Sequence, residues 1–263
     1  MLEFKIVFKM NKVINIAFES KSKQIDEIVK NFDSQGEDFG NQDRNTLKLF
    51  NLDDLIVNVK SFRIPNIVNQ IAYKYFRKSK AQRSYEYANK LLELKIGTPR
   101  PIAFYEFKTA FLFKESFYLS EHLDYDLTYR ELTTDFEYPD YDIILRAFTR
   151  FTYDLHEKGI NFLDHSPGNT LIIKEDDEYK FFLVDLNRMK FEPMDFDTRM
   201  KNMSKLTIHK HMVETMSDEY SKCSGEDYKT IFNAIWSETQ LFQYKFYRKK
   251  RLKNKLRFWK NKD

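Results

Sequence analysis

The stretch Leu163-Asp164-His165-Ser166-Pro167-Gly168-Asn169 contains the two residues that decide the fold, an aspartate and an asparagine five positions apart. A third polar residue, Asp185, follows after two short apolar runs. Taken alone, each is an ordinary turn residue, since Asp and Asn bond their own backbone readily. Their combined spacing is informative, because carboxylate and amide oxygens are the hard ligands that Mg²⁺ prefers.

The segments on both sides favour a positioned loop over a chance turn. Upstream, apolar residues recur at helical spacing at Ile143, Ile144, Ala147, Phe148, Phe151 and Leu155. Gly159 follows as a helix C-terminal signal. Downstream, Thr170–Ile173 and Phe181–Val184 read as strands on either side of the polar turn 175–178. We expect this hairpin to bring Asp185 back beside Asn169.

A lysine on a strand and a glutamate on a helix complete the pattern upstream. Leu55–Lys60 is a β-branched segment that ends in Lys60. An apolar stripe at Tyr85, Ala88, Leu91 and Leu92 predicts a following helix. We expect Glu86 to pair with Lys60. Each has an alternative reading: Lys60 as an edge-strand charge, and Glu86 as a partner of Lys90 on a solvated helix face.

The order of these elements resembles that of protein kinases. More specifically, residues 155–169 and 183–188 resemble the lipopolysaccharide core kinase family, which includes the Kdo and heptose kinases. The resemblance extends from about Gly36 to Asn187. It implies an α+β, protein-kinase-like fold of two lobes. Residues 1–122 would form an antiparallel sheet with one main helix, and residues 123–263 a mostly helical lobe.

The resemblance also implies a role for each site residue, with ATP and Mg²⁺ as cofactors. Asp164 would be the catalytic base, and Asn169 and Asp185 would be the metal ligands. Lys60 would contact the nucleotide phosphates, with Glu86 as its support. Gly36 and Gly40 would form a short glycine loop over the nucleotide, although two glycines spaced like this are more often a hairpin turn.

The chain departs from the protein-kinase pattern at three motifs. Phe162-Leu163-Asp164 stands where protein kinases have His-Arg-Asp, and Asp185-Leu186-Asn187 stands where they have Asp-Phe-Gly. No Ala-Pro-Glu sequence follows Asp185. These departures favour a small-molecule or glycolipid kinase over a phosphorylation-regulated protein kinase.

Composition predicts a packed protein in a reducing compartment. The 263 residues are 42% hydrophobic and 16% aromatic, enough for one substantial core or two smaller ones. Cys223 is the sole cysteine, so an internal disulfide is excluded and the cytoplasm is the simplest location. No uncharged apolar stretch reaches the roughly 18 residues of a transmembrane helix.

The positive charge is concentrated at the C-terminus. Residues 244–263 contain ten Lys or Arg and one acidic residue, whereas the rest of the chain has 34 basic and 39 acidic residues. Aromatic and aliphatic residues alternate with these cations, as in helices that bind the anionic inner-membrane surface from its cytoplasmic side. A second basic cluster comprises Lys74, Arg77, Lys78, Lys80 and Arg83. A solvated tail or a nucleic-acid patch is the alternative, and we expect no nucleic-acid partner.

These observations predict an ATP-dependent kinase that phosphorylates a sugar hydroxyl of Kdo-lipid A in the lipopolysaccharide inner core, with Kdo preferred. One alternative is a kinase of the same fold that acts on heptose, another small hydroxyl compound or protein. The other is a nucleotide-binding pseudokinase whose acidic glycine loop no longer supports catalysis.

Overall fold

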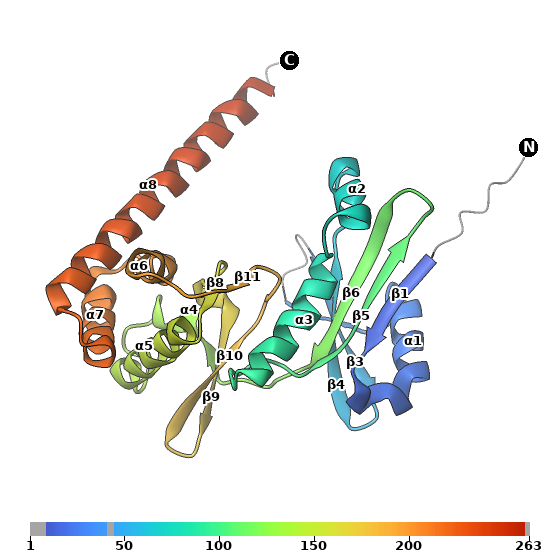
Figure 1. The fold of residues 1–263 in the computed structure, drawn as a ribbon, viewed down its shortest axis with the longest axis horizontal. Helices are drawn as coiled ribbons and strands as arrows, with labels where there is room; N and C mark the ends of the chain where they lie inside the picture. The colour runs from blue at the N-terminus through green and yellow to red at the C-terminus, as the bar shows by residue number, and fades with distance from the viewer. Residues whose placement is uncertain (1–8, 41–44, 261–263) are drawn as a thin grey trace, which may run out of the picture. The chain divides into compact units, whose positions relative to one another are not determined.

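The structure is a computed structural model that describes residues 9–40 and 45–260, and it divides into two compact units (Figure 1). The first unit comprises Met1–Asp124 and Leu183–Asn187, and the second comprises Tyr125–Phe182 and Arg188–Asp263. Residues 183–187, which include Asp185, belong to the first unit. The predicted division between residues 122 and 123 stays a prediction.

The first unit is built on an antiparallel sheet. Among the described residues its strands are β1 (Lys9–Ile14), β2 (Glu37–Asp38), β3 (Asn45–Leu52), β4 (Leu55–Phe62), β5 (Pro101–Lys108) and β6 (Phe113–Glu121). Their order across the sheet is β1-β5-β6-β4-β3-β2. The central strand β4 pairs with β3 through Lys60↔Leu47 and with β6 through Lys60↔Tyr118. Lys60 therefore lies in the middle of the sheet and not at its edge.

Helices pack on both faces of this sheet. They are the 3₁₀ helix η1 (Ile16–Lys21) and the α-helices α1 (Ser22–Lys30), α2 (Ile67–Tyr75) and α3 (Lys80–Glu93). Side chains of a strand alternate between faces. Val57 and Val59 of β4 accordingly pack in the cluster that contains α1, while Phe62 packs with Ala81 of α3. Lys60 is thus on the α3 face. The helix predicted from Tyr85 to Leu92 is α3; α1 and α2 are additional.

The second unit is mostly helical. Its helices are α4 (Tyr129–Leu132), α5 (Tyr141–Glu157), η2 (Pro167–Asn169), α6 (Phe196–Met203), α7 (Lys210–Ser224) and α8 (Tyr228–Lys260). Its strands are β7 (Leu127–Thr128), β8 (Ile160–Phe162), β9 (Thr170–Glu175), β10 (Glu178–Leu183, whose last residue belongs to the first unit) and β11 (Met189–Phe191). Phe148 of α5, Met216 of α7 and Ile231 of α8 share one buried core.

The predicted elements around the loop are present. The helix expected over residues 143–155 is α5, and Gly159 follows it in the left-handed conformation. The two predicted strands are β9 and β10, which are neighbours in one sheet. Among the described residues, no helix has both the length and the apolar content needed to cross a bilayer.

Candidate active site

Lys60 and Asp185 form an ion pair in the first unit. Lys60 Nζ lies 2.7 Å from Asp185 Oδ1, and the lysine side chain is 15% exposed against 37% for the aspartate. Asn187 Nδ2 donates to the same carboxylate oxygen over 2.8 Å. Asp185 Oδ2 is consequently the carboxylate oxygen left for a cation. This pair joins two residues that are 125 positions apart, Lys60, which was predicted to contact the nucleotide phosphates, and Asp185, which was predicted to bind the metal.

The segment that carries Asp185 is tied to the first unit by backbone contacts. The Leu183 N–H donates to Gly97 O over 2.8 Å, and Thr98 Oγ1 donates to Leu183 O over 2.8 Å. Asp185 itself adopts φ 58°, a left-handed conformation that is uncommon for a non-glycine residue and is enriched at functional sites. The backbone therefore fixes Asp185 opposite the end of β4.

The predicted Lys60–Glu86 ion pair is absent: Lys60 pairs with Asp185, and Glu86 pairs with Lys78. The Glu86 carboxylate accepts from Lys78 Nζ at 2.7 and 2.9 Å and from Gln82 Nε2 at 3.0 Å. Lys78 precedes Ser79, the N-cap of α3, and so lies close to the first turns of this helix. The predicted partner, Lys60, was chosen from the position of Glu86 in the helix. The lysine closer in sequence, Lys78, was overlooked.

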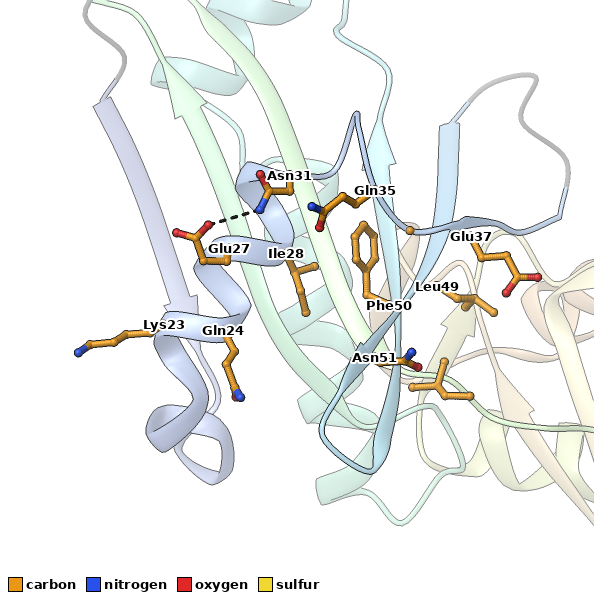
Figure 2. A pocket seen from close by; sticks show the side chains of 12 residues that line it. Lys23, Gln24, Glu27, Ile28, Asn31, Gln35, Glu37, Leu49, Phe50 and Asn51 are labelled. Carbon is orange, nitrogen blue, oxygen red and sulfur yellow. Dashed lines mark hydrogen bonds between the residues drawn. The ribbon is translucent and has the colours of Figure 1, made fainter.

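Gly36 and Gly40, the predicted glycine loop, flank the short strand β2, which pairs with β3. Gly36 has φ 84°, and a Cβ atom there would lie 2.5 Å from the Phe50 ring, so packing alone requires glycine. Gly36 lines a hollow of about 640 Å³ together with residues of α1, β3 and β4. Figure 2 shows side chains around this hollow, among them Ile28 and Phe50. Lys60 is not one of the residues that line it. Gly40 precedes residues 41–44, which lie outside the described residues and are followed by β3.

Asp164 and Asn169 are joined through the backbone of their loop in the second unit. Asn169 Nδ2 donates to the Asp164 backbone carbonyl over 2.8 Å, and the Asn169 N–H donates to Ser166 O over 3.0 Å. With the nitrogen of the amide turned to the loop, the Oδ1 atom faces away from it. The amide oxygen is therefore the atom left for a ligand, and the metal-binding role of Asn169 stays a prediction.

Arg188 is the main site residue that the sequence analysis left out. The Leu163 N–H donates to Arg188 O over 3.0 Å, which aligns the residues following β8 with the one preceding β11. Arg188 Nη1 then lies 2.9 Å from Asp164 Oδ1. Arg188 lies three residues after Asp185, but this position alone suggests no role. The pairing of β8 with β11, which brings Arg188 to Asp164, would also have had to be known.

Two further cations lie close to the same loop. Lys205 Nζ donates to Leu163 O over 2.6 Å, and its pKa is lowered by burial, partly offset by the nearby Asp164 carboxylate. A Cβ atom at Gly168 would lie 2.5 Å from Arg130 Nη2, so the guanidinium covers this part of the loop. The loop is therefore surrounded by positive charge, which favours anionic ligands.

A buried hydrogen-bond network supports the loop from below. Asn202 Oδ1 accepts from His165 Nδ1 at 2.9 Å and from His156 Nε2 at 3.2 Å, and its Nδ2 donates to Phe162 O at 2.8 Å. The Tyr220 hydroxyl lies 2.9 Å from His156 Nδ1. Burial lowers the pKa of His156 to about 3 and that of His165 to about 4, so both are neutral at physiological pH.

The donor atoms suit Mg²⁺. Among the described residues, no group of three or more His, Cys, Asp or Glu side chains is arranged to hold a metal ion. Mg²⁺ does not require one, because it commonly binds through one or two protein oxygens and completes its shell with phosphates and water. Asn169 Oδ1 and Asp185 Oδ2 are hard oxygens of this kind. The other polar atom of each side chain, Asn169 Nδ2 and Asp185 Oδ1, makes a hydrogen bond that orients the group.

The sequence matches the model of the lipopolysaccharide kinase (Kdo/WaaP) family over residues 64–233, which is more than half of the chain. The chain belongs to this family. The match includes Asp164, Asn169 and Asp185, whereas Lys60 precedes it. A search of curated proteins gives no match.

Two solved structures resemble this chain in fold. A structure of WaaP in complex with acyl carrier protein aligns with TM-score 0.62 and 16% identity, covering 89% of this chain and 97% of that one. The Rio2 kinase from Chaetomium thermophilum, solved as an ADP/Mg²⁺-phosphoaspartate complex, aligns with TM-score 0.48 and 14% identity, covering 84% and 75%. The fold is protein-kinase-like, with mixed helices and antiparallel sheet.

Proposed function

We propose that this lipopolysaccharide kinase transfers the γ-phosphoryl group of ATP to a sugar hydroxyl of Kdo-lipid A, with Kdo as the preferred acceptor. The observation that carries the proposal is the geometry of the 164–169 loop. It holds a carboxylate for the acceptor hydroxyl and an amide oxygen for a metal five residues later, joined by the Asn169–Asp164 hydrogen bond.

Asp164 would orient the attacking hydroxyl more than it would activate it. Arg188 occupies Oδ1 of this carboxylate, so Oδ2 is the atom that accepts a hydrogen bond from the sugar. Phosphoryl transfer has a loose transition state in most analyses, so positioning supplies most of the acceleration that a base would give.

Lys60 and Asp185 would exchange their present partners when nucleotide binds. The lysine ammonium would move to the α- and β-phosphates, as the family resemblance implies, and the Asp185 carboxylate would become a metal ligand. Mg²⁺, when bound, neutralises the charge that develops on the phosphate oxygens. The proposal requires Asn169 and Asp185 to act on the same nucleotide.

The basic tail would provide electrostatic attachment to the anionic cytoplasmic face of the inner membrane. Its described part is the end of α8, where Tyr244, Phe246 and Leu252 are each more than half exposed. Arg248, Lys249, Lys250 and Arg251 are consecutive in the helix. Because successive helical residues are about 100° apart, these cations surround the helix and leave no continuous apolar face. Attraction to headgroups suits this pattern better than deep insertion.

Mass spectrometry of the acceptor tests the proposal. The protein is incubated with Mg²⁺, ATP and Kdo-bearing lipid A, and in parallel with a heptose-bearing core acceptor. One added phosphate on the Kdo sugar, absent with Asp164→Ala, is the expected result. Phosphate on heptose alone would move the specificity to the alternative acceptor. Nucleotide binding without transfer to any hydroxyl acceptor would favour a pseudokinase.

A further inference from the structure

The helix α2 is built with its apolar side facing outward. Ile67, Val68, Ile71 and Tyr75 are 63, 73, 43 and 55% exposed, and Phe76, which follows the helix, is 82% exposed. We call these five residues the α2 apolar face. At about 100° per residue, the four helical members fall within one 100° sector. A continuous stripe of this kind normally packs against a protein core.

The polar side of α2 faces the sheet instead. Gln70 is 8% exposed, and its Nε2 donates to Pro65 O over 2.8 Å. Lys74 Nζ donates to the carbonyls of Thr109 and Ala110 in the turn between β5 and β6, and the Tyr73 ring lies 5.6 Å from that of Phe113. Figure 1 shows α2 beside β6. These polar contacts hold the helix in place, so its outward orientation is fixed by the fold.

The surroundings of the α2 apolar face are cationic. Residues 61–85 contain six basic residues, Arg63, Lys74, Arg77, Lys78, Lys80 and Arg83, and no acidic residue. Arg63 and Arg77 are exposed, and so is Lys78, although its ammonium pairs with Glu86. Phe111, next to the turn that Lys74 contacts, adds a further apolar side chain that is 76% exposed. An apolar stripe with aromatic residues and a basic border is complementary to a bilayer surface that carries anionic headgroups.

We infer that the α2 apolar face inserts into the interfacial region of an anionic lipid bilayer. The occupant is a membrane surface, because exposed aromatic and aliphatic side chains match the acyl boundary while the border of cations matches phosphate headgroups. This contact is separate from the tail, whose cations surround α8 without an apolar face. It deepens the proposed function, on which it rests for the expectation of a membrane-borne acceptor. It would hold the first unit at the surface where that acceptor lies.

A fluorescent label on the face tests this insertion with the full chain. Ile71→Cys in a Cys223→Ser background is labelled with an environment-sensitive dye and mixed with vesicles of phosphatidylglycerol and phosphatidylethanolamine. We expect a blue shift with these vesicles and little with phosphatidylcholine vesicles. An unchanged spectrum while the protein sediments with the vesicles would overturn the inference and leave the tail as the membrane contact.

Charge substitutions on the same face give an independent test. Val68→Asp combined with Phe76→Ser should lower the vesicle partition coefficient at least tenfold, which is about 1.4 kcal/mol. The matched control is Ile16→Asp, because Ile16 is 83% exposed but lies in η1. Partitioning equal to that of the unsubstituted protein would contradict the inference. A concentration-dependent dimer that Val68→Asp abolishes would instead assign the face to a second copy of the chain.

Measurements of turnover distinguish a failure of this inference from a failure of the proposed function. With free Kdo as a soluble acceptor, the Val68→Asp, Phe76→Ser protein should keep the unsubstituted turnover, since neither residue belongs to the site. If no protein phosphorylates any acceptor while vesicle binding still depends on α2, the proposed function fails and the membrane contact stands. If transfer is intact and vesicle binding is independent of α2, only this inference fails.

Discussion

Lys60 and Asp185 meet through a partly exposed ion pair, whereas the loop that carries Asp164 rests on a buried hydrogen-bond network. A carboxylate that is 37% exposed can exchange its partner at little cost, because water and other ions can replace the lysine. The buried contacts of Asn202 cannot be exchanged in this way without leaving polar groups unpaired. We infer that the Lys60–Asp185 pair can rearrange when a ligand binds and that the loop carrying Asp164 is preorganised.

Asp164→Ala should have the largest effect on activity. Loss of a positioned acid–base group costs about 10²- to 10⁴-fold in turnover, and ATP affinity should change little because Asp164 would contact the acceptor. Turnover and nucleotide binding are measured separately on the same preparation. Asp154→Ala is the control, since its carboxylate pairs with Lys158 on the surface of α5. A loss below tenfold would remove Asp164 from the catalytic role.

Lys60→Met should weaken ATP binding by about 1.5–3 kcal/mol, the usual contribution of a hydrogen bond to a charged group. Calorimetric titration with Mg²⁺-ATP measures this loss. Lys90→Met serves as the control, because Lys90 pairs with Glu93 on the exposed side of α3. Unchanged affinity in Lys60→Met would mean that the lysine stays with Asp185 and does not reach the phosphates.

Asn202→Ala should break the support of the loop. The substitution leaves the two histidine N–H groups without their acceptor, and the Phe162 carbonyl keeps only the His165 N–H. We expect a loss of about 1–3 kcal/mol in the free energy of unfolding. Urea denaturation measures it, and Asn51→Ala on the exposed part of β3 is the comparison. Turnover should fall as well. Full stability in Asn202→Ala would show that the network does not hold the loop.

Acid should destabilise the second unit through the same network. The folded-state pKa values of His156 and His165, about 3 and about 4, lie below the ordinary value of 6.5. The unfolded chain therefore binds protons first, and stability that is complete above pH 6.5 is lost as the pH falls towards these values. From pH 6.5 to 5.5 the loss should be about 1 kcal/mol per histidine or less. Urea unfolding midpoints are measured against pH for the unsubstituted protein and for His156→Gln. The midpoint should decline more steeply with acid in the unsubstituted protein. Equal slopes would mean that the buried histidine is not the cause.

Glu86→Gln should have the smallest effect. Its carboxylate binds Lys78 and Gln82, and the pair with Lys78 is partly exposed, so its contribution is under about 1 kcal/mol. ATP affinity should change less than twofold. A tenfold loss of affinity, measured by the same titration as for Lys60→Met, would mean that Glu86 moves to Lys60 during nucleotide binding, as the family resemblance implies.

Local periodicity was sufficient to predict the elements around the loop. The apolar spacing of Ile144, Phe148 and Leu155 correctly predicted the buried face of α5, and the apolar runs on either side of a polar turn predicted the hairpin of β9 and β10. These features depend on residues close in the chain. The Asp164–Asn169 contact also follows from a spacing of five residues within one loop.

Contacts between distant segments could not be predicted in this way. Asn202 lies about 40 residues from the loop it supports, and no spacing rule connects the two. The helix α2 was not predicted, and periodicity could have shown its apolar face but not which way that face points. The partner of Glu86 depended on where the chain before α3 places Lys78.

A double-mutant cycle between Asn169 and Asp185 tests the central proposal most directly, because the proposal is that these two predicted metal ligands bind one Mg²⁺-nucleotide. Affinity for Mg²⁺-ATP is measured for the unsubstituted protein, Asn169→Ala, Asp185→Asn and the combination. We predict that each single substitution weakens binding and that the double variant loses less than the sum, with a coupling of roughly 0.5–3 kcal/mol. Strictly additive losses would contradict a shared metal site.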